Sequence, residues 1–129
     1  MLKQILAGIL GALTVANGLV MLIDGARWYE LTPGVSHTGP YNPHFVADIG
    51  AAFLVAGLGL LARAWRPRLW PAAAVGAGFV GLHGAIHVFE IATGHVHDAA
   101  TDIGLVVIPA ALTVWAALPS QGESHAQNA

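Results

Sequence analysis

Apolar residues fill four long runs of this chain, and polar residues gather between them. The runs extend from Lys3 to Ile23, His44 to Trp65, Trp70 to Thr93 and Ala99 to Leu118. A helix needs roughly 20 residues to cross a hydrocarbon core about 30 Å thick, and each run has about that length. The pattern predicts an all-α fold, a transmembrane four-helix bundle that forms a single membrane domain over residues 1–118. The polar residues 119–129 are expected to form a short disordered tail.

Composition supports a membrane protein and argues against nucleic acid as a partner. Of the 129 residues, 56% are hydrophobic and only 9% are charged, which is too apolar for an ordinary small soluble domain. The lipid bilayer is therefore the expected partner. A net charge of -2 with five Lys and Arg residues provides no basic surface for nucleic acid. The chain has no Cys, so a metal would have to be held by nitrogen and oxygen ligands.

The few cations predict an orientation. Lys3 precedes the first run, and Arg63, Arg66 and Arg68 crowd the short second connection, whereas the first connection has only Arg27 and the third has no Lys or Arg. By the positive-inside rule, both termini and the Arg-rich turn face the cytoplasm. The sequence thus predicts a multi-pass protein of a bacterial inner membrane, with the first and third connections in the periplasm.

Ionisable residues inside the runs are candidates for function, because charge is costly in hydrocarbon. The third run carries His83, His87 and Glu90 in an H-x-x-x-H-x-x-E pattern, and two further pairs four residues apart open the second and fourth runs. Residues four apart share one helix face, so these side chains can point into a common interior. All lie toward the expected periplasmic end. The predicted metal ligands are His44, Asp48, His83, His87, Glu90, Asp98 and Asp102.

Mixed imidazole and carboxylate ligands suit a divalent transition metal ion such as iron, zinc, manganese or cupric copper. The candidates outnumber the four ligands of a closed zinc site, so either the site is dinuclear or some residues support the ligands. Alternatives remain for individual residues. Asp98 can be the N-cap of the fourth helix, His95 and His97 can be solvated loop residues, and the whole set can be a polar network that joins helices.

Two further features concern packing and the first connection. Small residues at every fourth position of the third run (Ala73, Ala77, Gly81 and Ala85) predict a helix-packing seam on the face opposite the histidines.

Turn-forming residues between Asp24 and Pro43 predict an irregular ordered loop, with Trp28, Tyr29 and Tyr41 at the headgroup level. This loop can act as a lid over the site and contribute His37 as an additional ligand.

The segment WYELTPGVSHTGPYNPHFVADIG, residues 28–50, resembles a signature of small four-helix inner-membrane proteins of bacteria that have no assigned activity. The resemblance covers mainly the first connection and the start of the second run. It implies a bacterial membrane context. It names no reaction, and no catalytic residue is carried over from it.

Four functions fit this pattern. The first is a membrane metalloprotein, an oxidoreductase or hydroxylase that acts on a small or lipid-soluble substrate. The second is divalent metal handling or transport, in which His37, His95 and His97 form a collecting vestibule. The third is a non-catalytic accessory subunit, locked by its polar residues to a partner subunit or to another copy. The fourth is haem binding through two histidines, for which the carboxylates are unnecessary. The runs contain no Ser, and the chain shows no Ser-His-Asp triad pattern, so covalent acyl chemistry is not expected. No glycine-rich phosphate loop follows a strand, so nucleotide binding is not expected either.

The predicted orientation can be tested with single cysteines, because the natural chain has none. Ser36→Cys and Arg66→Cys are probed on intact cells with a membrane-impermeant thiol reagent. Labelling at position 36 and not at position 66 is expected, since the cation bias places the first connection outside. The opposite labelling pattern would place the candidate ligands in the cytoplasmic half.

Overall fold

The computed structural model describes residues 1–120, and all regular secondary structure within them is helical. Long helices form α1 (Leu2–Ile23), α3 (Pro43–Trp65) and α4 (Trp70–Thr93). The fourth is continuous through α5 (Ala99–Asp102), the π-helical turn η3 (Ile103–Val107) and α6 (Ile108–Ala117). These four helices are long and apolar enough to cross a membrane, as expected of a multi-pass membrane protein. The tail predicted to be disordered lies outside the described residues from position 121 onward.

Local chemistry sets the ends of these helices. The Asn42 side chain accepts a hydrogen bond from the Phe45 N–H (3.1 Å), and Pro43 occupies the first helical position of α3. At the other end of the next helix, Gly94 stops α4 in the left-handed conformation, with φ at 72°. The short turn between α3 and α4 contains the 3-10 segment η2 (Pro67–Leu69).

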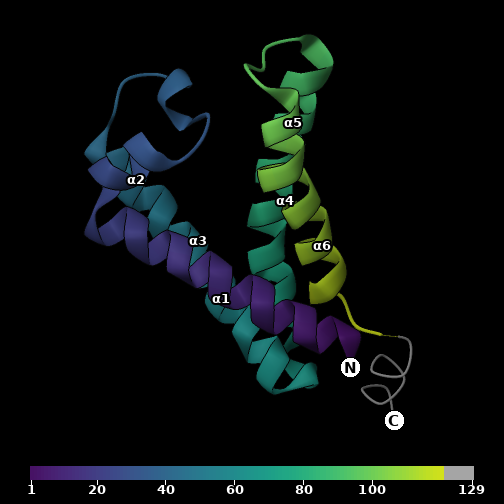
Figure 1. Cartoon of the computed structure of the whole chain (residues 1–129). Coiled ribbons are helices and arrows are strands. Elements are labelled where there is room, and N and C mark those ends of the chain that lie inside the picture. Colours follow the sequence, from purple (N-terminus) through teal and green to yellow (C-terminus); the bar gives the residue numbers. More distant parts are fainter. Residues whose placement is uncertain (121–129) are drawn as a thin grey trace.

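The four helices are arranged as two pairs. Figure 1 shows α1 beside α3 and α4 beside α6, with the pairs meeting near the N-terminus and diverging toward the end that carries α2 and α5. At the meeting point, α1 contacts both α3 and α6, and α3 contacts α4. The core there is made mainly of small buried residues from all four helices: Ala7, Leu60, Ala73, Ala77, Ala116 and Ala117. The bundle is thus closed at the end that holds the N-terminus.

Glycines let the helix backbones touch. A Cβ atom added at Gly18 of α1 would lie 2.6 Å from the Gly50 carbonyl oxygen of α3, and one at Gly57 would lie 2.7 Å from the Val15 nitrogen. A Cβ at Gly76 of α4 would lie 2.7 Å from the Ala56 Cα of α3. Real Cβ atoms do not approach so closely, so any larger residue would push these helices apart. Glycine contacts therefore join both α1 to α3 and α3 to α4.

The packing seam of α4 differs from the predicted one. Ala73 and Ala77 are buried as expected, but Ala85 is exposed. The buried stripe continues instead through Val80 and Gly84, where an added Cβ would lie 2.6 Å from the Ala110 Cβ of α6. His87 follows Gly84 by three residues and thus lies on the same stripe. The histidine face is not opposite the packing face, because the helix rotates its contacts from α3 toward α6.

Arg63 is buried, although the sequence grouped it with the cations of the short turn. Its Nε donates to the Ala116 carbonyl (2.6 Å) and its Nη2 to the Leu118 carbonyl (2.9 Å). Lys3 donates to the carbonyl of Leu118 (3.2 Å) as well. The last carbonyls of a helix have no partner within the helix and carry partial negative charge, so two cations satisfy the end of α6.

The first connection is more regular than predicted. Residues Gly25–Leu31 form the helix α2, whose N-cap Asp24 accepts from the Arg27 N–H (3.3 Å). The Trp28 indole N–H donates to Asn17 Oδ1 of α1 (2.9 Å), which holds α2 against the first span. The expectation of an irregular loop was wrong for this segment, since the turn-forming residues begin only at Pro33. The next residues form the 3-10 turn η1 (Val35–His37).

The glycine contacts generate a stability test with a matched control. Gly18→Ala is expected to lower the unfolding temperature in detergent, because its methyl group meets α3 backbone and overpacking costs about 1–3 kcal/mol. Gly78→Ala is the control, since nothing lies within 4 Å of its Cβ position. Equal unfolding temperatures for the two variants would contradict backbone contact between α1 and α3.

Candidate metal centre

Three ionisable side chains meet between α4 and the start of the fourth helix. His87 Nδ1 lies 2.8 Å from Asp102 Oδ2 and 3.9 Å from Glu90 Oε2. One ligand atom from each of the three residues lies within 4.8 Å of the others. We call these three residues the His87 cluster. Among residues 1–120 it is the one group of three or more His, Cys, Asp or Glu side chains that close together.

The cluster is half-buried. The side chains of His87 and Asp102 are 19% and 16% exposed, and that of Glu90 is 42% exposed. His87 and Glu90 are three residues apart on α4, so they share a face, and Gly84 below them allows α6 to approach closely. The cluster therefore depends on contact between α4 and the fourth helix.

Asp102 directly precedes the π-helical turn. The Ile108 N–H bonds to the Ile103 carbonyl five residues earlier, which widens this turn. Pro109 explains the widening, because a proline cannot donate to the carbonyl four residues before it and its ring clashes with that carbonyl. Such π-turns occur often at functional sites. The sequence predicted one regular helix here, and Pro109 was the signal for the irregular turn.

His83 borders the cluster one turn earlier in α4. Its ring centroid lies 4.9 Å from that of His87 at an interplanar angle of 76°, and 5.7 Å from the ring of Phe53 on α3. Phe53 in turn packs edge-on against Phe79 (5.1 Å). His83 thus lies between an aromatic contact and the His87 cluster, as the nearest additional imidazole.

His44 and Asp48 form a separate pair on α3. His44 Nε2 lies 3.5 Å from Asp48 Oδ2, so the spacing of four does bring the two side chains together. They are 89% and 63% exposed and are not part of the His87 cluster. Figure 1 shows why: α3 runs with α1, and this pair of helices diverges from α4 and α6 at the end that carries both groups.

Asp98 caps a helix. Its carboxylate accepts hydrogen bonds from the Ala100 N–H (3.0 Å) and the Thr101 hydroxyl (2.5 Å). The Thr101 hydroxyl first, and then the backbone N–H groups of Thr101 and Ala100, lower the pKa of Asp98 below its usual value. The capping interaction therefore holds at neutral pH and weakens as the pH falls through the carboxyl range. The sequence offered this role as an alternative to metal binding.

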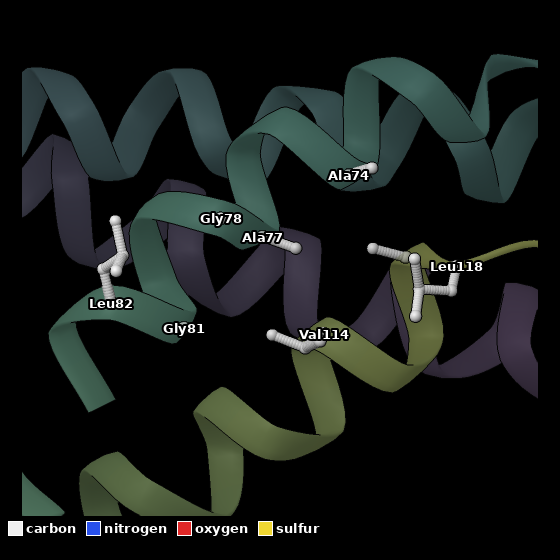
Figure 2. Close-up of a pocket in the computed structure, with 8 residues that line it drawn as sticks. Ala74, Ala77, Gly78, Gly81, Leu82, Val114 and Leu118 are labelled. Atoms are coloured by element: carbon white, nitrogen blue, oxygen red, sulfur yellow. The ribbon is translucent and has the colours of Figure 1, made fainter. Parts of the chain in front are cut away.

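A second concave surface lies away from these groups. A groove of about 430 Å³ lies between α4 and α6. Figure 2 shows Gly78, Gly81 and Ala74 on one side of it and Val114 and Leu118 on the other. All of its lining side chains are apolar, and it contains no residue of the His87 cluster. The groove therefore offers no polar side chain to orient a charged substrate.

The charges of the His87 cluster favour a cation. Two carboxylates close together repel each other, and one neighbouring imidazole offsets at most one of their charges. A divalent metal ion would compensate both. The hydrogen-bond contact between His87 and Asp102 also matches the carboxylate–histidine pairs that orient metal-binding imidazoles.

No family model, no curated protein and no solved structure matches this chain. The case for a function therefore depends on the residues themselves.

Proposed function

We propose that this chain is an integral membrane protein that binds a divalent transition metal ion through His87, Glu90 and Asp102. The observation that carries the proposal is the convergence of three ligand atoms, within 4.8 Å, from two helices that are long and apolar enough to cross a membrane. Ionisable groups in such helices are costly unless they are paired or bind an ion. A structural ion pair needs two such groups, and this cluster has three.

The donor set narrows the choice of metal. One imidazole and two carboxylates suit iron, manganese or zinc, and His83 can add a second nitrogen after a small movement. Three protein ligands leave a coordination position for water or substrate. An open position is what metal-assisted oxidation or hydroxylation of a small or lipid-soluble substrate requires. The exposed fraction of Glu90 supports access to the ion from that side.

Two other functions rank lower. Transport of the ion would need polar groups along the spans, whereas the buried charged residue at the opposite end, Arg63, is engaged with the end of α6. An accessory subunit is favoured by one observation, the 2.8 Å contact of His87 with Asp102, which can join the two helices without a metal.

The proposed location follows from the remaining cations. Arg66 and Arg68 are exposed at the turn between α3 and α4, at the end opposite the His87 cluster. By the positive-inside rule, the cluster then lies in the periplasmic half of a bacterial inner membrane, and both termini are cytoplasmic.

Metal content tests the proposal. The chain is purified in detergent without chelator, supplied with iron or manganese, dialysed and analysed for metal. About one ion per chain is expected, with loss of most bound metal in His87→Ala and Asp102→Asn, because each removes one of the three direct ligands. His83→Ala should weaken binding.

Two variants serve as controls for this measurement. His44→Ala removes an exposed imidazole outside the cluster, and Asp98→Ser keeps the helix cap while removing a carboxylate, so both should retain the metal. Full metal occupancy in a folded His87→Ala variant would refute the ligand assignment. A natural chain that retains no metal would favour the accessory subunit.

A further inference from the structure

Two histidines from distant parts of the chain meet outside the His87 cluster. His37 ends the 3-10 turn η1 of the first connection, and His97 lies in the connection between α4 and α5. Their ring centroids are 4.1 Å apart, with an interplanar angle of 50°. Both residues are exposed. The contact therefore joins two surface connections rather than two core elements.

The ring nitrogens of this pair make no hydrogen bond within residues 1–120. No hydrogen bond or ion pair of the described chain involves the imidazole of His37 or of His97. Their neighbours are engaged differently: His95 Nδ1 lies 2.9 Å from the Thr93 hydroxyl oxygen, and Asp98 accepts from Ala100 and Thr101. Both imidazoles are thus exposed at the surface and close to each other.

Both connections are held by their own hydrogen bonds. The Tyr29 hydroxyl donates to the Gly39 carbonyl, which ties the segment around His37 to α2. In the other connection, the His95 N–H bonds to the Glu90 carbonyl (2.9 Å) at the end of α4. The two imidazoles are therefore placed by local structure, and a ligand that binds both pays less to order them.

The position of the pair matters because the helix pairs diverge at this end. Figure 1 shows the first connection above α1 and α3, and the α4–α5 connection above the other helix pair. The tilted contact between the two histidine rings joins these two connections directly. A ligand that holds them together would clip the two halves of the molecule where the helices themselves are apart.

We propose that His37 and His97 form a second metal site, which takes zinc or cupric copper and clips the first connection to the α4–α5 connection. Imidazole is the ligand that both ions accept readily, and water completes the coordination. Each nitrogen would lie about 2.0–2.1 Å from the ion. Ring centroids only 4.1 Å apart place the two imidazoles near enough to share one ion. With two protein ligands, the site exchanges its metal more readily than the His87 cluster. This second site is independent of the proposed function, because it shares no residue with the His87 cluster.

The test uses the full chain without a polyhistidine tag, in a His125→Ala background that removes the imidazole of the tail. Zinc and cupric copper binding are measured by calorimetry in His87→Ala protein, where the His87 cluster is disabled. One exchangeable site should remain. His37→Ala and His97→Ala should each weaken it by about tenfold or more, while His95→Ala, the matched control, should not.

A distance measurement provides a second readout that does not depend on the His87 cluster. Spin labels are attached to Glu30→Cys and Ala92→Cys, both exposed positions, in the otherwise cysteine-free natural chain. Zinc should narrow the distribution of distances between the labels, and His37→Ala should abolish this effect. Unchanged zinc affinity in both His37→Ala and His97→Ala, or equal weakening by His95→Ala, would overturn the second site. Loss of metal from the His87 cluster alone would bear only on the proposed function.

Discussion

Backbone contact at glycine is the interaction on which the rest of this structure depends. Helices in a bilayer gain little from the hydrophobic effect when they associate, so close packing and satisfied polar groups must hold them together. Here Gly18 and Gly57 bring α1 and α3 into contact, Gly76 brings α4 to α3, and Gly84 brings α6 to α4. Arg63 then binds the last carbonyls of α6 and closes the bundle at one end. Close packing thus joins the helices at several points along their length, and polar satisfaction closes one end.

The same contacts explain the size of the candidate metal centre. Because α3 pairs with α1, its predicted ligands His44 and Asp48 lie away from α4 and remain exposed at the diverging end (Figure 1). Because α4 pairs with the fourth helix through Gly84, His87 and Glu90 meet Asp102. The helix pairing therefore brings together three of the seven predicted ligands. The widened turn Ile103–Val107 follows Asp102 directly and connects it to α6.

The helices and their limits could be predicted from the sequence, because run length and hydropathy are local properties. The observed α1 and α4, for example, begin and end at or within one residue of the predicted runs. The pairing of His87 with Glu90 also follows from spacing along one helix. Which helices lie together could not be predicted, since it depends on contacts between glycines in different segments. The burial of Arg63 and the Asn17–Trp28 hydrogen bond were also missed from the sequence, because both depend on contacts with other segments of the chain.

X-ray absorption spectroscopy at the edge of the bound metal tests the central claim most directly. A metal held by the His87 cluster should show only nitrogen and oxygen neighbours at about 2.0–2.2 Å, with the outer-shell scattering of imidazole. In Asp102→Asn protein loaded with excess metal, the oxygen shell should change while the imidazole signal persists. A spectrum with sulfur neighbours, or one that is identical in the natural chain, His87→Ala and Asp102→Asn, would contradict the assignment of the centre to these residues.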